Sequence, residues 1–264
     1  MGTIEAVKKG FSVATKNLGL VLVIFAFNLI WNLASIPFAQ APGTTVTPQA
    51  TASAMALSIV FILASIFVQG GSLGIVRDSI KEGSAKLGKF ASYGLKYYIK
   101  LFGLGLLIIL VIAVFALIAT IIIAATTPIN NPVVTAVAAI IAITIGAVGL
   151  YCILLLMMSP YVLVCEESGV VASMKRSMEV VRKAIGRVLL LLVVLILISL
   201  GIGFLIGFVI GITTAAMPVK VSQVVIGVIN SAFNGYLGVV MMASFMTIYL
   251  ALAGKEKVAA QKVF

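Results

Sequence analysis

Long uncharged apolar runs, separated by short basic segments, constrain the fold of this chain more than any other sequence feature. All 18 Lys and Arg residues except Lys220 fall into four segments. These basic segments are Lys8 to Lys16, Arg77 to Lys100, Lys175 to Arg187 and Lys255 to Lys262. Cations that gather at the ends of apolar runs are typical of a membrane protein, and this arrangement indicates an even number of spans.

Six apolar runs are long enough to form helices that cross a hydrocarbon core, which takes about 20 residues. The predicted spans lie near 18–38, 53–73, 101–125, 133–158, 187–213 and 223–252. Only 9% of the residues are charged and 62% are hydrophobic, whereas about a quarter of a soluble domain is charged. The runs are continuous rather than alternating, which argues against membrane-spanning strands. The sequence therefore predicts an all-α polytopic membrane protein with six transmembrane helices.

The charge of the connections predicts the orientation of these spans. The connections near 40–51 and 126–132 carry no charge, and the one near 214–222 carries only Lys220. Because loops rich in Lys and Arg stay on the cytoplasmic side during insertion, we expect a cell-membrane protein with both termini in the cytoplasm.

The first span has a second interpretation. Three lysines, an apolar stretch and then Phe38-Ala39-Gln40-Ala41 resemble a secretory signal with its cleavage site. The apolar part is about as long as a span rather than a signal, so we interpret it as a retained helix.

A four-residue sequence pattern recurs three times along the chain. A cation precedes a span and a Gly lies at the entry to that span, at intervals of 84 and 83 residues. The marks are Lys16-Asn17-Leu18-Gly19, Lys100-Leu101-Phe102-Gly103 and Lys183-Ala184-Ile185-Gly186. A fixed long period indicates duplication, which predicts one membrane domain, 1–264, with three hairpin repeats near 1–74, 75–160 and 161–254. The alternative is that any six-span protein with Lys at its inner boundary shows a similar rhythm.

Two of the basic segments have the periodicity of amphipathic helices. In the first, the apolar stripe is Ile4, Val7, Phe11, Ala14 and Leu18. In the third, it is Val171, Met174, Met178, Val181, Ile185 and Val188. Such helices lie in the membrane interface with the apolar side in lipid. The middle segment contains Gly83-Ser84 and is expected to bend there; its residues Tyr93, Tyr97 and Tyr98 suit the interfacial aromatic belt.

The cations of the third segment are the candidates for binding lipid headgroups. They are Lys175, Arg176, Arg182, Lys183 and Arg187. A cation near an anionic leaflet contributes about 1 kcal/mol of attraction. The alternative is that these segments are membrane-parallel linkers that only orient the hairpins.

The start of the third segment resembles a known family. It reads Ser159-Pro160-Tyr161-Val162-Leu163-Val164-Cys165-Glu166-Glu167-Ser168-Gly169, then Lys175-Arg176-Ser177. This resembles the membrane domain found beside glycerophosphoryl diester phosphodiesterases and related six-span families, which show a similar Pro, acidic residue and Gly, then Arg-Ser. The resemblance implies the six-span fold and a loosely defined membrane role. No phosphodiesterase domain is present in this sequence, so that activity is not implied.

The motif itself, Pro160, Glu166, Glu167, Gly169, Arg176 and Ser177, has a physical interpretation. Pro160 ends or kinks the fourth span, because proline cannot donate a helical hydrogen bond. Glu166 or Glu167 could pair with Arg176 or Arg182. We prefer a structural ion pair to a site for a cationic ligand.

The side-chain inventory argues against an enzyme. The chain has no His, the commonest base and transition-metal ligand, and we expect all seven carboxylates to lie outside the hydrocarbon region. Cys152 and Cys165 are interpreted as small apolar residues. We therefore expect no catalysis, metal or cofactor. The net charge of +11 is explained by topology, so no nucleic-acid partner is expected either.

Neutral amides within the spans keep a transport role open. Asn28 and Asn32 share one helix face, as do Asn230 and Asn234. These pairs could line a cavity for a small solute or lipid, or bond across neighbouring helices, which is the commoner role of such groups. We expect packing, and take as the function a non-enzymatic membrane protein that engages anionic lipid and organises the bilayer; a transporter or channel is the alternative.

Glycines indicate where helices approach closely. Gly203, Gly207 and Gly211 lie four residues apart and could join spans within one chain or join two chains in a homo-oligomer. Gly70, Gly71 and Gly74 are expected to mark a break at the inner end of the second span.

Overall fold

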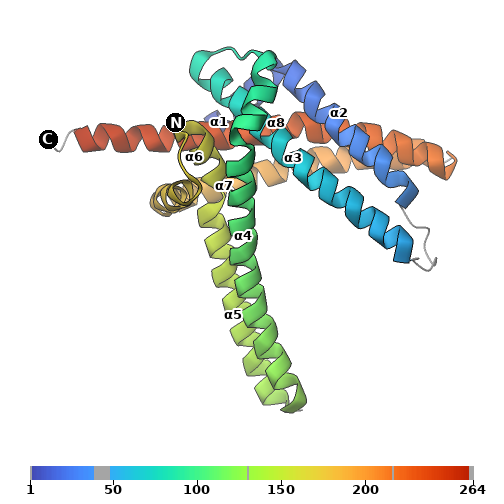
Figure 1. The fold of residues 1–264 in the computed structure, drawn as a ribbon, viewed down its shortest axis with the longest axis vertical. Coiled ribbons are helices and arrows are strands. Elements are labelled where there is room, and N and C mark those ends of the chain that lie inside the picture. The colour runs from blue at the N-terminus through green and yellow to red at the C-terminus, as the bar shows by residue number, and fades with distance from the viewer. Residues whose placement is uncertain (1, 39–47, 130, 216, 262–264) are drawn as a thin grey trace. The chain divides into compact units, whose positions relative to one another are not determined.

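The protein is all-α over residues 2–38, 48–129, 131–215 and 217–261, which are the residues that the computed structural model describes. They form eight α-helices and three short 3₁₀ helices (Figure 1). The α-helices are α1 (Thr3–Lys16), α2 (Leu18–Ser35), α3 (Pro48–Glu82), α4 (Phe90–Thr126), α5 (Pro132–Leu156), α6 (Ser159–Glu166), α7 (Val170–Thr214) and α8 (Val219–Gln261). The 3₁₀ helices are η1 (Ile36–Phe38), η2 (Leu87–Lys89) and η3 (Thr127–Ile129). The predicted fold class is confirmed.

Within the described residues, six helical stretches are long and apolar enough to cross a membrane, which indicates a membrane protein. They are Leu18–Ser35, Thr51–Glu82, Leu87–Ile129, Pro132–Glu166, Val170–Thr214 and Val221–Gly254. The 37 residues of α4 make a helix of about 55 Å, far longer than a hydrocarbon core of about 30 Å. Long helices of this kind therefore continue into the interface, and the basic segments are largely their continuations.

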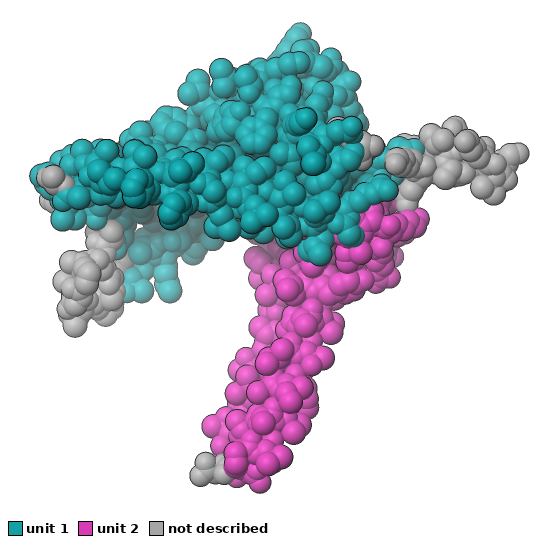
Figure 2. All heavy atoms as spheres, turned by 180° about the vertical axis from the view of Figure 1, so that it is seen from behind, with its two compact units in different colours: residues 1–98, 186–264 teal, residues 99–185 magenta. Residues whose placement is uncertain are grey.

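The chain divides into two compact units (Figure 2). The first comprises residues 1–98 and 186–264, and the second comprises residues 99–185. Two helices, α4 and α7, contribute to both units. The predicted repeat units, 1–74, 75–160 and 161–254, stay a prediction.

The first unit is built around α8, which contacts α1, α2 and α3. Val239, Val240, Ala243, Met246 and Tyr249 of α8 are wholly buried. Glycines allow these close approaches. A Cβ atom at Gly10 of α1 would lie 2.6 Å from the Val240 carbonyl oxygen, and one at Gly235 would lie 3.1 Å from the Phe25 nitrogen of α2.

Protein rather than lipid alone covers the inner face of α1. Its buried residues are Thr3, Ala6, Val7, Gly10, Val13 and Ala14. Val7 and Ala14 of the predicted stripe are thus buried, but Ile4 is 67% exposed and Leu18 is 55% exposed. The face of α1 that packs on α8 is the one that carries the small residues. A small residue such as Gly10 admits the α8 backbone at close range.

The inner end of α3 differs from the prediction of a break at Gly70, Gly71 and Gly74. The helix continues to Glu82, and the chain turns at Gly83, where φ is 77° and glycine is favoured. The predicted bend at Gly83-Ser84 is therefore confirmed. A Cβ atom at Gly74 would meet the ring of Tyr93, and one at Gly71 would meet the ring of Phe90. These two glycines therefore leave room for aromatic side chains of α4 and do not interrupt α3.

The second unit contains most of the α4–α5 hairpin, α6 and the start of α7. The two hairpin helices run side by side (Figure 1), and Gly149 of α5 lies under the Phe115 ring of α4. Helix α5 ends at Leu156, and Pro160 lies in the first turn of α6, where a missing N–H costs nothing, so the apolar stretch Pro132–Glu166 is interrupted between the two helices. In α7, Ala184 departs from helical geometry (φ −136°, ψ 27°), which places a kink between most of the basic segment and the span, with Arg187 on the span side.

Candidate functional site

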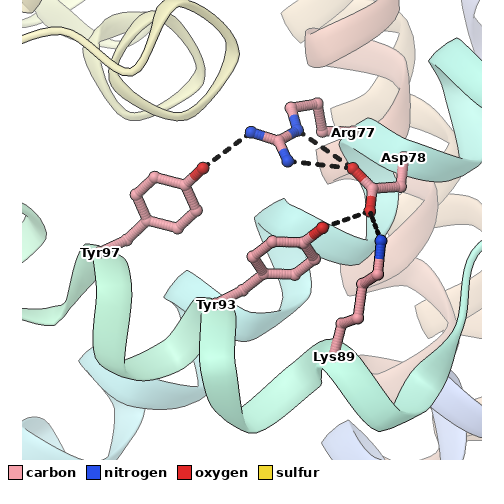
Figure 3. Close-up of polar contacts among 5 residues, drawn as sticks. All are labelled: Arg77, Asp78, Lys89, Tyr93 and Tyr97. Carbon is pink, nitrogen blue, oxygen red and sulfur yellow. Dashed lines mark hydrogen bonds and ion pairs between the residues drawn. The ribbon is translucent and has the colours of Figure 1, made fainter.

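A cluster of charged and hydroxyl side chains, centred on a buried ion pair, lies where α3 ends and α4 begins. This Asp78 cluster comprises Arg77, Asp78, Lys89, Tyr93 and Tyr97 (Figure 3). The Asp78 side chain is 5% exposed and that of Arg77 is 12% exposed. Their charges are therefore held largely out of water, in a part of the chain close to the predicted membrane boundary.

Each oxygen of the Asp78 carboxylate has a partner. Arg77 Nη2 lies 3.0 Å from Oδ1 and Arg77 Nε donates to the same oxygen at 3.2 Å. The Tyr93 hydroxyl donates to Oδ2 at 2.5 Å, and Lys89 Nζ lies 3.9 Å from that oxygen. Arg77 Nη1 also donates to the hydroxyl of Tyr97, which is wholly buried. The cluster is thus a satisfied ion-pair network that ties α4 to α3, and its carboxylate has no oxygen left over for a ligand.

The Asp78 cluster was missed by sequence reasoning. The sequence predicts Tyr93, Tyr97 and Tyr98 in the interfacial belt. The Tyr97 ring is instead buried, which corrects the prediction for that residue, and the hydroxyls of Tyr93 and Tyr97 point into the cluster (Figure 3). The sequence places Asp78 outside the hydrocarbon with the other carboxylates, and that prediction does not extend to its burial within the protein. One usable signal was present: Gly71, Gly74 and Asp78 lie on one face of α3, so that face had to meet a close neighbour.

The cations of the third basic segment fall into two groups. Lys175, Arg182, Lys183 and Arg187 are exposed. Arg176 is half-buried and lies 3.7 Å from Glu166 and 3.3 Å from Glu179. The predicted pairing of Glu166 with Arg176 therefore forms, and it engages one of the five predicted headgroup ligands in an internal ion pair.

The turn between α6 and α7 is held by backbone and side-chain contacts. Glu167 ends α6 in the left-handed region (φ 52°), beside Gly169. Lys100 Nζ of α4 donates to the carbonyls of Glu167 and Ser168 at 3.2 and 3.3 Å. A cation suits these carbonyls because the last carbonyls of a helix have no helical partner. Ser177 is buried and its hydroxyl donates to the Leu155 carbonyl at 2.7 Å, which docks α7 on the end of α5.

Replacing Ser177 with Ala should lower the free energy of unfolding by about 1–2 kcal/mol, because the Leu155 carbonyl loses a buried donor. Thermal unfolding in detergent would measure this loss. The matched control is Ser65→Ala, because that hydroxyl bonds only within its own helix, to Ile62, at an exposed position. Equal behaviour of the two variants would contradict a docking role for Ser177.

The model of a family described as a domain of unknown function, DUF7847, matches residues 1–252. The chain belongs to this family. Searches of curated proteins and of solved structures found no significant match. DUF7847 membership assigns no activity, so the resemblance to the membrane domain beside the phosphodiesterases stays a prediction.

The four predicted amides of this DUF7847 member lie in different surroundings. Asn32 Nδ2 donates to Ser231 Oγ of α8 at 2.9 Å and to the Asn28 carbonyl at 3.0 Å. The packing role is thus confirmed for Asn32. Asn234 instead lines an open groove of about 420 Å³ with residues of α7, and Asn230 is exposed.

The predicted glycine ridge of α7 is largely open in this DUF7847 member. A Cβ atom at Gly203 would lie 4.0 Å from the Phe233 ring, and nothing lies within 4 Å of Gly207 or Gly211. Close packing of spans within the chain uses other glycines, so a role of this ridge between two chains stays a prediction.

Proposed function

We propose that this protein is a non-enzymatic multi-pass membrane protein whose cytoplasmic basic segments, above all the segment at the start of α7, engage anionic lipid headgroups and thereby organise the bilayer around it. The observation that carries the proposal is the way in which the first part of α7 packs. Its serine face is turned toward the protein, while four of its cations and part of its apolar stripe stay exposed.

The buried face of this segment is narrow. Ser173, Ser177, Val180 and Val181 are buried, so most of the protein contact is made by small side chains. Val171 of the apolar stripe is 57% exposed, and Met174 and Met178 are half-buried. Exposed apolar side chains beside exposed cations are the combination that a helix needs to lie at a lipid surface.

The charge of the segment favours an anionic surface. From Val170 to Arg187 it holds five cations and one carboxylate, Glu179, a net charge of +4. Glu179 is within 3.3 Å of Arg176, so the pair is neutral and the exposed cations set the local field. At about 1 kcal/mol for each cation near an anionic leaflet, four cations supply a substantial attraction that salt weakens.

The proposal includes the predicted topology. With both termini in the cytoplasm, the basic segments face the cytoplasmic leaflet of the cell membrane, which is the more anionic surface. The polar groups of the Asp78 cluster are satisfied internally, so they support this role by fixing the α3–α4 corner.

The test compares two variants that remove the same charge. The first replaces Lys175, Arg182, Lys183 and Arg187 with Gln. The control replaces Lys8, Lys9, Lys16 and Lys86 with Gln, at positions outside the α7 segment. Native mass spectrometry in neutral detergent would measure binding of phosphatidylglycerol relative to phosphatidylcholine. We expect the first variant to lose at least about tenfold in preference for phosphatidylglycerol, which is 1.4 kcal/mol and less than half of the full attraction.

Each outcome of this comparison is informative. A loss confined to the α7 variant supports a localised headgroup site. An unchanged preference in the α7 variant would overturn the proposal, and an equal loss in both variants would reduce it to an effect of net charge. Raising the salt concentration should weaken the preference of the unmodified protein, since exposed charges are screened.

A further inference from the structure

Two amide side chains of α8 have no hydrogen-bond partner in the part of the chain that the structure describes. Asn230 and Asn234 are both exposed and lie one helical turn apart, on one face of the helix. The neighbouring Ser231 is buried and contacts Asn32 of α2, whereas Phe233 approaches Gly203 of α7. The amides therefore occupy the open strip of α8 between its contacts with α2 and α7.

These amides lie deep within a span. Asn234 is about 20 Å along the helix from Val221 and about 30 Å from Gly254, the two ends of the span, at 1.5 Å per residue. The hydrocarbon of a bilayer offers no hydrogen bonds to such groups, and an unpaired amide in hydrocarbon is costly. A group that supplies both hydrogen-bond donors and acceptors at mid-membrane is needed at this strip.

The surroundings of Asn234 leave room for such a group. The groove of about 420 Å³ beside it is lined on the α7 side by Ile196, Ser199 and Leu200. Further along α7, Gly207 and Gly211 leave the backbone open to a neighbour. Lipid chains can fill an apolar groove, but they offer no hydrogen bonds to an amide.

We propose that the strip formed by Asn230 and Asn234, with the adjoining groove, is the contact surface for a second copy of this chain. An amide is self-complementary, because its NH₂ group donates and its oxygen accepts, so two copies satisfy each other without any further ligand. The interface is separate from the cations of the proposed headgroup site, so the two proposals stand or fall independently.

The membrane restricts the geometry of this dimer. Both copies have the same orientation in the bilayer, so a two-fold axis that relates them runs along the membrane normal. Each residue then meets residues at its own depth. Asn234 of one copy faces Asn234 of the other, with Asn230 or Ser199 as its further hydrogen-bond partners.

Cysteine crosslinking in proteoliposomes tests this arrangement. In a background with Cys152 and Cys165 replaced by Ala, we expect Asn234→Cys to form a covalent dimer with an oxidant or a short bis-thiol reagent. Ala232→Cys is the matched control, because Ala232 is exposed at nearly the same depth but lies about 160° around the helix from Asn234. Equal crosslinking at the two positions, or none at Asn234→Cys, would overturn the proposal.

A second measurement does not depend on cysteine chemistry. Asn230→Leu combined with Asn234→Leu should weaken dimerisation at least about tenfold, measured by single-molecule photobleaching over a range of protein-to-lipid ratios. Ala232→Leu should leave dimerisation unchanged. A monomer in the unmodified protein at every ratio would overturn the proposal, and binding of a polar solute by that monomer would assign the amides to the transport alternative.

Discussion

Replacing Asp78 with Asn is expected to destabilise the protein by about 3–5 kcal/mol, the usual cost of breaking a buried ion pair. The substitution removes the negative charge that lies 3.0 Å from the Arg77 guanidinium, whose side chain is only 12% exposed. Since the whole stability of a protein is about 5–15 kcal/mol, much of the chain should fail to accumulate in folded form. Thermal unfolding and the monodisperse yield in detergent would measure this effect.

A compensating variant distinguishes charge from packing. When Asp78→Leu is combined with Arg77→Met, both charges of the buried pair are gone, and most of the loss should be recovered. The hydroxyls of Tyr93 and Tyr97 lose the partners shown in Figure 3, so recovery should be incomplete. A double variant as unstable as Asp78→Asn would show that the buried charge is not the cause.

Replacing Gly10 with Leu should separate α1 from α8. A Cβ atom there would lie 2.6 Å from the Val240 carbonyl oxygen and still closer to the Ser244 hydroxyl. Backbone atoms cannot rotate away, so we expect an overpacking cost of about 1–3 kcal/mol and outward movement of α1. Hydrogen exchange of residues 3–16, which measures local opening of that helix, should rise sharply.

The matched control for this helix contact is Gly201→Leu. Gly201 is exposed within α7 and nothing lies within 4 Å of an added Cβ, so this variant should keep its stability. Unchanged hydrogen exchange of α1 in Gly10→Leu would contradict the close approach of the two helices.

The spans and the bend could be predicted because their causes are local. Uncharged runs of sufficient length form helices in a membrane wherever the rest of the chain lies, since their backbone groups must be satisfied internally. Gly83-Ser84 likewise marked a turn, and Gly83 adopts the positive φ that glycine tolerates. Proline at position 160 likewise predicted the interruption between α5 and α6, because proline suits the first turn of a new helix.

Burial of polar side chains could not be predicted, because it depends on which helix arrives as a neighbour. Tyr97 is of a residue type that is common in the interfacial belt. However, α3 brings Arg77 to its hydroxyl, and the ring is buried within the protein, away from lipid. Asn32 and Asn234 look alike in sequence, but only Asn32 meets a serine on another helix. The predicted apolar stripe of α1 was partly wrong for the same reason, because the small residues of α1, rather than its large apolar ones, face α8.

The hydrogen bonds of Lys100 to the carbonyls after α6 give some of the cations two successive tasks. In the predicted topology, cations orient the spans during insertion. The helices have not yet packed at that stage, so the number of cations in each loop decides the orientation. After folding, Lys100, Arg77 and Arg176 are held by internal contacts. The charge that an inserting chain presents is therefore larger than the charge that the finished protein shows to its surroundings.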